Sequence, residues 1–349
     1  MICQKIRKKL AKTAAFLMAA ALCFPIFTEN INAAGKKLIP LGRTTGIKLF
    51  SGGAMVVGFA SSEATGGASP AQRGGLAVGD VIMAVDGISV ESNEELSSAL
   101  SSLKRGSAVL TVRRGGDTVD ITVDGLLPHE NGGYRLGAWV RDSMAGIGTI
   151  TFVGPATGEF GALGHGICDV DTGRLMPFDN GSTMTSTVTG AVRGQRGKPG
   201  QLTGEFDLRQ DSGILRENTG GGIFGVLTDK SLYSGLKAVE TAGIDDVRCG
   251  KVEILSNVNG TEVERYSAKI TRIMKNEESG RDFMLEITDD RLIGRTGGIV
   301  QGMSGSPILQ DGRLIGAVTH VLINDPEQGY GISIDNMMGY SSTLTLSAA

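Results

Sequence analysis

The 349-residue sequence lacks a surplus of either charge: 34 Lys and Arg stand against 37 Asp and Glu, for a formal net charge of −3. A nucleic-acid-binding protein would show a basic surplus or a high isoelectric point, so the composition argues against that class. Cysteines are few, four in all, and none forms a CxxC pair or stands at zinc-ligand spacing from a histidine. We therefore expect no metal site and no cofactor.

Long helical patterns are also scarce, whereas glycine is abundant at 53 of 349 residues. Glycine without a Gly-X-Y period indicates many tight turns rather than a collagen triple helix. Each glycine costs a helix about 1 kcal/mol relative to alanine, so extended helices are disfavoured. A hydrophobic content of 40% suffices for a globular core. The composition predicts a mainly β protein, and the length favours two or three domains.

Residues 1–34 have the features of an export signal. Five cations precede an uncharged, mostly apolar stretch over residues 13–27, and Asn32-Ala33-Ala34 supplies small residues where a signal peptidase would cut. The apolar stretch is short for a membrane span, which needs about 20 residues. Two interpretations stay open: a cleavable signal peptide or a short membrane anchor. In both, the rest of the chain is exported.

Only two cysteines, Cys168 and Cys249, fall in the exported part. An oxidising compartment would permit one disulfide between them. Two free, buried thiols are the alternative, and the sequence does not choose between the two.

Residues 43–125 combine short strand patterns, one helical period and Gly-rich turns. Strands are predicted at 46–49, 54–59, 108–113 and 118–123, with a Gly115-Gly116 hairpin turn. A helix is predicted over 92–103, capped by Ser92 or Asn93. The motifs Ser69-Pro70-Ala71, Gly75-Leu76, Gly79-Asp80-Val81-Ile82 and Val85-Asp86-Gly87 resemble the PDZ domains of bacterial exported proteases. Such a domain captures an extended peptide by strand addition. The resemblance places the carboxylate-binding loop at 43–47, with Thr45, Gly46 and Ile47 as peptide-binding residues.

Residues 124–133 are rich in Pro, Gly and Asn and are predicted to be a linker. From residue 134 to 345, short strand patterns alternate with Gly-rich turns, and the one helical pattern covers residues 232–242. Many short strands without βαβ alternation predict a sandwich or barrel, and about 210 residues suit a double β-barrel.

The strongest chemical signal is Gly302-Met303-Ser304-Gly305-Ser306-Pro307, which precedes an apolar strand. In chymotrypsin-like proteases a Gly-x-Ser-Gly-x-Pro turn projects the nucleophile while backbone N–H groups face the developing oxyanion. Ser304 is the predicted nucleophile, and the N–H groups of Gly302 and Ser304 form the predicted oxyanion hole. Ser306 is the alternative nucleophile.

A serine nucleophile needs a base, and the chain has three histidines: His129, His165 and His320. The chymotrypsin order is His, Asp, Ser, which fits His165 and excludes His320. His320 is expected to pack beside the site. The acid then lies between His165 and Ser304, and the residues alone leave these candidates open: Asp169, Asp171, Asp179, Asp207, Asp211, Asp282, Asp289 and Asp290.

Residues 134–334 resemble the SpoIVB peptidase family of endospore-forming bacteria. The resemblance rests on the run 141–149, on Gly161-Ala162-Leu163-Gly164-His165, on the run 296–307 and on Gly316-Ala317-Val318-Thr319-His320-Val321. It implies a His165–Asp289–Ser304 triad, with Asp290 as the adjacent alternative for the acid. It also implies a serine endopeptidase of the forespore intermembrane space. That enzyme would cleave itself and a membrane-associated regulator, which triggers activation of sigma-K in sporulation.

Overall fold

The computed structural model describes residues 34–61, 67–130, 132–275 and 280–345. The predicted export segment, together with Cys3 and Cys23, lies outside these residues but for Ala34. Among the described residues, no helix has the length and apolar character to cross a membrane. The fold is mainly β, as the composition predicted, with a PDZ domain and two closed β-barrels.

The PDZ domain is built on a sheet backed by one helix. Its strands are the second half of β2 (Thr44–Phe59), β3 (Val81–Val85), β4 (Ile88–Ser89), β5 (Ser107–Arg114) and β6 (Asp117–Asp124). Helix α3 (Asn93–Ser102) is capped by Ser92, one of the two predicted caps, whose side chain accepts a hydrogen bond from the Glu95 N–H. The short helix α2 is Pro70–Arg73. Leu96 and Leu100 of α3 join the buried core that the sheet covers.

The first barrel closes as a ring of six strands, in the order β9-β10-β13-β12-β11-β2, because β2 and β9 pair with each other. The new members are β9 (Ala138–Val153), β10 (Glu159–Ala162), β11 (Asn180–Val192), β12 (Gln201–Thr219) and β13 (Gly222–Leu227). Strand β1 (Lys37–Pro40) pairs with β9 on one side and with β14 (Val239–Glu240) on the other.

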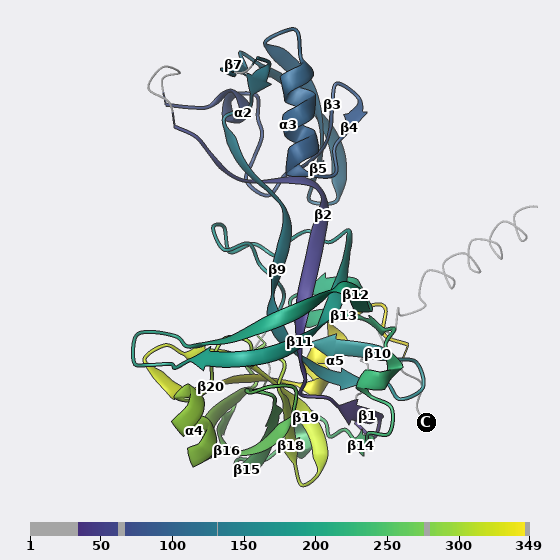
Figure 1. Ribbon diagram of the computed structural model, residues 1–349, viewed down its shortest axis with the longest axis vertical. Helices are drawn as coiled ribbons and strands as arrows, with labels where there is room; N and C mark the ends of the chain where they lie inside the picture. The colour runs from purple at the N-terminus through teal and green to yellow at the C-terminus, as the bar shows by residue number, and fades with distance from the viewer. Residues whose placement is uncertain (1–33, 62–66, 131, 276–279, 346–349) are drawn as a thin grey trace, which may run out of the picture. The chain divides into compact units, whose positions relative to one another are not determined.

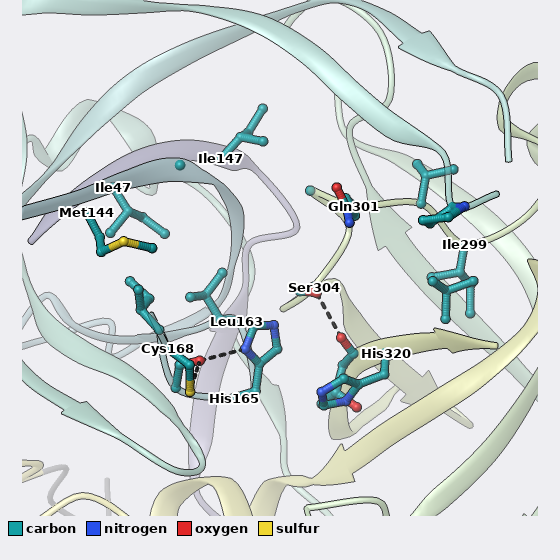
Figure 2. A pocket seen from close by; sticks show the side chains of 18 of the residues that line it. Ile47, Met144, Ile147, Leu163, His165, Cys168, Ile299, Gln301, Ser304 and His320 are labelled. Carbon is teal, nitrogen blue, oxygen red and sulfur yellow. Dashed lines mark hydrogen bonds between the residues drawn. The ribbon is translucent and has the colours of Figure 1, made fainter. Parts of the chain in front are cut away.

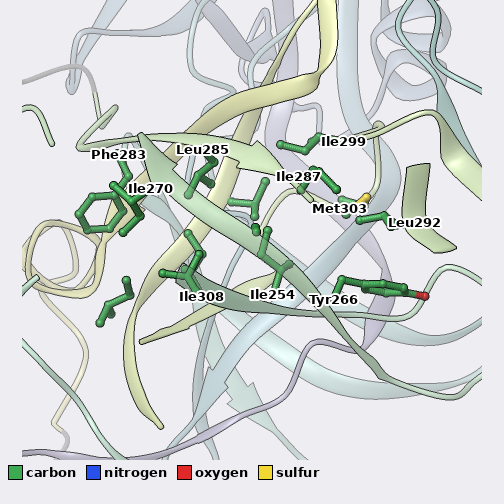
Figure 3. Close-up of a cluster of buried hydrophobic side chains, with 14 of the residues drawn as sticks. Ile254, Tyr266, Ile270, Phe283, Leu285, Ile287, Leu292, Ile299, Met303 and Ile308 are labelled. Carbon is green, nitrogen blue, oxygen red and sulfur yellow. The ribbon is translucent and has the colours of Figure 1, made fainter. Parts of the chain in front are cut away.

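The second barrel is a closed ring, β15-β16-β17-β20-β19-β18. Its strands are β15 (Gly250–Ser256), β16 (Glu264–Ile273), β17 (Phe283–Ile287), β18 (Pro307–Gln310), β19 (Arg313–Leu322) and β20 (Asp325–Ser333). Helix α4 (Asp290–Thr296) precedes the Ser304 turn, and α5 (Ile334–Gly339) follows the barrel. Figure 3 shows its core, into which Met303 of the Ser304 turn points beside Leu292 and Ile299. Met303 is fully buried, so the turn is anchored one residue before Ser304.

Strands β2 and β9 belong to both the PDZ domain and the first barrel (Figure 1). The pairs from Thr44↔Thr149 to Phe50↔Ser143 lie in the barrel, and those from Met55↔Arg141 to Phe59↔Ala138 lie in the PDZ sheet. A register shift between Phe50 and Met55 separates the two sets. The chain therefore enters and leaves the PDZ domain through two neighbouring strands.

Three local predictions are corrected by the structure. The helix expected over 232–242 is a 3-10 turn, Lys230–Leu232, followed by β14, because Gly235 at φ 80° leaves the helical region. A second 3-10 turn is Ile244–Asp246. The expected linker holds a short hairpin, β7 (Leu127–Pro128) with β8 (Tyr134–Arg135). The predicted PDZ segment from residue 43 begins too early, because residues 44–50 are barrel strand.

Candidate active site

A cavity of about 460 Å³ contains both His165 and Ser304 (Figure 2). The His loop after β10, the Ser304 turn and strands β2, β9 and β19 all contribute to its walls, so both barrels form it. No carboxylate lines it among the described residues. Most of its lining is apolar: Ile47, Met144, Ile147, Leu163, Ile167, Ile299, Val300, Val321 and Ile323.

Ser304 lines the cavity, whereas Ser306 does not. The Ser306 side chain is fully buried and its hydroxyl pairs with that of Ser256 at 3.0 Å. The Ser304 hydroxyl donates to the backbone carbonyl of Thr319 at 2.8 Å. Of the two serines, Ser304 alone is placed to meet a substrate.

The backbone of the Ser304 turn leaves two N–H groups without a hydrogen-bond partner in the described part of the chain, those of Gly302 and Ser304. The directions of these two N–H groups are fixed by the hydrogen bonds that the carbonyls of the same peptide groups accept. The Gln301 carbonyl accepts from Leu202 N–H at 2.8 Å, and the Met303 carbonyl accepts from Ser306 N–H at 2.9 Å. Because C=O and N–H point in opposite directions in a trans peptide, both free N–H groups face away from these partners. This arrangement suits an oxyanion hole.

Gly302 and Gly305 give the turn its shape. Their φ angles are 99° and 95°, values that favour glycine. A Cβ on Gly305 would lie 2.0 Å from the Thr149 carbonyl oxygen. Glycine is therefore needed at both positions for the positive φ angle, and at Gly305 also because β9 lies too close to leave room for a side chain.

His165 is held in one tautomer by its own loop. Its Nδ1 lies 2.9 Å from the Gly166 carbonyl, which can only accept, so Nδ1 carries the proton and Nε2 has the lone pair. Burial lowers the pKa of His165 below 6.5, partly offset by this hydrogen bond. The ring is therefore neutral at pH 7 and has a base available at Nε2. The preceding Leu163 sits at φ 69°, a strained conformation for a non-glycine residue.

Two further residues hold the loops in place and were missed in the sequence. Thr149 of β9 accepts from Leu163 N–H, donates its N–H to the Ser304 carbonyl at 2.9 Å, and donates its hydroxyl to the Gly302 carbonyl at 2.7 Å. The Asn218 side chain accepts from Ile167 N–H at 2.8 Å and donates to the Ile167 carbonyl at 3.0 Å. Neither residue stands in a recognisable short motif, although Thr149 ends the run 141–149.

The structure does not bring Asp289 to His165. Asp289 caps α4, accepts from Arg291 and from Ser267 N–H, and is absent from the cavity lining. The Arg291 side chain holds the pKa of Asp289 below its usual value. Asp290 is exposed in the first turn of α4. Among the described residues, none of the other candidate acids hydrogen-bonds to His165 either; buried Asp169, for example, pairs with Arg141 at 2.7 Å.

The predicted peptide-binding residues of the PDZ domain are wrong. Thr45, Gly46 and Ile47 are paired on one side with β9 and on the other with β11, so no peptide strand can add there. Ile47 instead lines the cavity with His165 and Ser304.

A different groove, of about 440 Å³, lies between α3 and the start of β9. At its end, the Leu136 and Gly137 carbonyls accept from Ala71 and Ala60 N–H groups. The N–H groups of Gly137 and Ala138 therefore point the other way, and neither has a partner within the described ranges. The signal for this loop was Arg135-Leu136-Gly137-Ala138, after the PDZ-like region rather than before it.

Cys168 and Cys249 are both free and exposed, so the structure has neither the disulfide between them nor the buried thiols that the sequence left open as alternatives. Desolvation raises the pKa of the Cys168 thiol, which lies in the cavity wall.

Comparison with protein families decides the assignment. The SpoIVB peptidase S55 family matches residues 132–338. The chain belongs to this family. The PDZ domain family matches residues 65–124. A search of curated proteins found no match.

Among solved structures, the active form of the Rv3671c protease from M. tuberculosis is similar at 15% identity and a TM-score of 0.32, over 59% of this chain and 75% of that one. Its Ser343Ala mutant, inactive form, is similar at 14% identity and a TM-score of 0.29, over 56% and 80%. This SpoIVB-family member is a serine endopeptidase with a PDZ domain, and its substrates are proteins or peptides.

Proposed function

We propose that Ser304 is the nucleophile and His165 the general base of this endopeptidase, and that the Gly302 and Ser304 N–H groups stabilise the oxyanion. The observation that carries the proposal is the shared cavity, which is lined both by Ser304 and by a neutral histidine whose Nε2 is unprotonated. Asp289 is not assigned a role, because its carboxylate is engaged by Arg291 and Ser267.

Catalysis begins when the Ser304 hydroxyl turns from the Thr319 carbonyl to His165 Nε2. Ser304 Oγ attacks the peptide carbonyl carbon while Nε2 takes the hydroxyl proton. The developing negative charge lies on the carbonyl oxygen, between the two N–H groups of the turn. His165 then gives the proton to the leaving amine, and water repeats the sequence to release the acyl group. The Gly166 carbonyl keeps Nδ1–H in place throughout.

The apolar wall of the cavity favours a large hydrophobic side chain next to the scissile bond. Burying such a side chain is worth about 1.5–3 kcal/mol, whereas a charged one would lose its hydration without a partner. We therefore propose a preference for aliphatic or aromatic residues at the cut.

Family membership supports a finer proposal about biology. The enzyme acts after export, in the forespore intermembrane space. There it cleaves itself and a membrane-associated regulator, and so triggers sigma-K activation in sporulation.

The direct test is labelling of purified protein with a serine-directed fluorophosphonate, followed by mapping of the modified residue. We expect the label on Ser304, and a loss of peptide hydrolysis of at least about a thousandfold in Ser304→Ala. The matched control is Ser306→Ala, which removes a buried hydroxyl two residues away and retains most activity. A label on Ser306, or equal loss in both variants, contradicts the assignment.

We infer a second function, peptide capture, from the groove beside α3. Its edge is the free side of β9 at residues 138–142, where a strand can add, and its end carries the unpartnered N–H groups of Gly137 and Ala138. Such a pair suits a peptide carboxylate. Leu96 and Leu100 contribute apolar wall, which suits an apolar last residue.

Binding of a fluorescent peptide with an apolar C-terminus to the Ser304→Ala protein tests this capture. We expect the peptide with a free carboxylate to bind at least about tenfold tighter than the amidated peptide, because only the negatively charged carboxylate accepts charge-assisted hydrogen bonds from the two N–H groups. Ser97→Asp, in the groove, weakens binding, whereas Ser98→Asp, the next exposed residue on α3 and outside the groove lining, does not. Equal binding of both peptide forms contradicts a carboxylate site.

A further inference from the structure

The active-site cavity holds a second imidazole whose role the proposed mechanism does not use. His320 of β19 lines the cavity, and its ring centroid lies 5.2 Å from that of His165, with 37° between the ring planes (Figure 2). The Nδ1 atom of His320 is buried and has no hydrogen-bond partner among the described residues. A buried polar atom without a partner is costly to a fold, so this atom calls for a functional explanation.

An irregularity in β19 directs His320 into the cavity. The β19–β20 ladder shifts register between Val318 and His320, so Thr319 is left out of the regular pairing. Such bulges re-aim side chains and are common next to active sites. The same bulge frees the Thr319 carbonyl, which accepts the Ser304 hydroxyl. This bulge thus provides a hydrogen-bond acceptor for Ser304 and places the His320 ring near that of His165.

In the part of the chain that the structure describes, no carboxylate hydrogen-bonds to His165. When His165 takes the Ser304 proton it becomes an imidazolium, which a carboxylate stabilises in a Ser-His-Asp triad. Among the described residues no carboxylate lines this cavity, and the Gly166 carbonyl is the one partner of Nδ1. An uncharged imidazole beside the ring can fill the gap, since it has a lone pair and a polarisable face.

We propose that His320 is a positioning residue for His165: its neutral ring holds the base in place and stabilises the imidazolium that forms during acylation. The inference rests on the proposed function of Ser304 and His165. The proton taken from Ser304 stays on His165 Nε2 until the leaving amine receives it, so His320 neither gains nor loses a proton.

The charges around His320 keep it neutral. Its pKa is lowered to about 4, first by burial and then by repulsion from His165 and Arg281. Arg281 stacks on the ring of Tyr330, the residue opposite His320 in the ladder. Among the cavity-lining residues that the structure describes, the other titratable group is Cys168, whose raised pKa keeps the thiol protonated at pH 7. No positive charge on His320 therefore opposes the imidazolium above pH 5.

The decisive measurement is the pKa of His165 by NMR of labelled histidine rings in the Ser304→Ala protein, which needs no substrate. With three histidines in the chain, assignment is direct. We expect His320→Phe to lower the pKa of His165 by about one unit, which corresponds to a tenfold loss of imidazolium stability. His320→Gln, which returns a carbonyl acceptor, recovers part of the shift. The matched control is Tyr330→Phe, across the ladder, which leaves the pKa unchanged.

Kinetics in the Ser304 enzyme give a second readout. We expect His320→Phe to reduce kcat about tenfold with KM unchanged, and to move the acid limb of kcat/KM to lower pH. A pKa of His165 that is unchanged or raised in His320→Phe overturns the proposal, as does a loss of kcat that only follows the loss of folded protein. If the wild-type protein fails to react with fluorophosphonate, the proposed function fails, while the NMR measurement still decides the role of His320.

Discussion

At the scale of single residues, the active site depends on backbone carbonyls as much as on side chains. The Gly166 carbonyl selects the His165 tautomer, and the Thr319 carbonyl holds the Ser304 hydroxyl. A carbonyl oxygen accepts a hydrogen bond at any pH, whereas a carboxylate must be ionised. Orientation of His165 is therefore independent of the titration of any acid.

Asp289 provides a test of this arrangement. Because Asp289 caps α4 and pairs with Arg291, we expect Asp289→Ala to destabilise the protein by about 1 kcal/mol, as loss of a helix cap does. Asn is also a good cap, so Asp289→Asn should cost less. Because Asp289 does not contact His165, kcat should stay within a few-fold of wild type in both. Thermal unfolding and steady-state kinetics measure the two effects.

A contrary result would be informative. If Asp289→Asn keeps the wild-type melting temperature but loses kcat a thousandfold or more, Asp289 belongs to the catalytic triad that the family resemblance implies. The lowered pKa of Asp289 adds a second check. The ionised Asp289 carboxylate stabilises the folded protein at pH values above the unfolded-state pKa of this group. That contribution to the free energy of unfolding is lost as pH falls through the lower folded-state pKa.

At the scale of the elements, strand β9 hydrogen-bonds both to the loop that carries His165 and to the Ser304 turn. Thr149 of β9 hydrogen-bonds to Leu163 in the His165 loop and to Gly302 and Ser304 in the Ser304 turn. The hydrogen bond from the Thr149 hydroxyl to the Gly302 carbonyl is buried, so its loss would leave a buried acceptor without this partner.

Thr149→Val keeps the shape of the side chain and removes the hydroxyl. We expect a loss of about 1–3 kcal/mol in unfolding free energy, because the Gly302 carbonyl loses a buried partner. We also expect kcat/KM to fall about a hundredfold as the turn shifts relative to His165. Thr149→Ser, which keeps the hydroxyl, is the control and should retain most activity. If the two variants behave alike, the hydrogen bond to Gly302 has no part in catalysis.

Local signals allowed several elements to be predicted. The Ser92 cap with its helical period predicted α3, and Gly115-Gly116 between alternating runs predicted the β5–β6 hairpin; both are confirmed. The helix expected near residue 235 failed because one glycine with positive φ outweighed the apolar period. Ser304 and His165 could be predicted as site residues because each stands in a short Gly-rich motif, and the structure places both in the wall of one cavity.

Features that depend on contacts between distant parts of the chain could not be predicted from the sequence. The partner of His165 Nδ1 is a backbone carbonyl, which leaves no trace in residue type. The peptide groove combines α3 with a segment about 40 residues later, and the strand Thr44–Phe59 is continuous through two domains. Only the three-dimensional structure shows that Ile47 is paired between β9 and β11 and lines the cavity with His165 and Ser304.

For the whole molecule, the combination of a protease with the proposed peptide groove predicts self-processing. We expect the expressed wild-type protein to appear as shortened species, because a serine endopeptidase can cut other copies of its own chain. Ser304→Ala should accumulate as one longer form. The groove raises the local concentration of a captured segment, so Ser97→Asp should change the pattern of cuts more than the hydrolysis of a small peptide. Mass spectrometry of the purified forms measures both.

The same experiment has a clear negative outcome. If wild-type and Ser304→Ala proteins are cut at the same sites and rates, another protease performs the trimming. Ser98→Asp serves as the matched control for the groove, and its cutting pattern should equal that of the wild type.

The shared strands β2 and β9 also bear on how such a protein could have arisen. Seen from the first barrel, residues 51–142 are one very long hairpin loop, because the chain leaves at Phe50 and returns at its ladder partner Ser143. A module grafted into a hairpin leaves the order of the barrel strands untouched. Recombination at these two points could therefore exchange one inserted domain for another without rebuilding the catalytic scaffold.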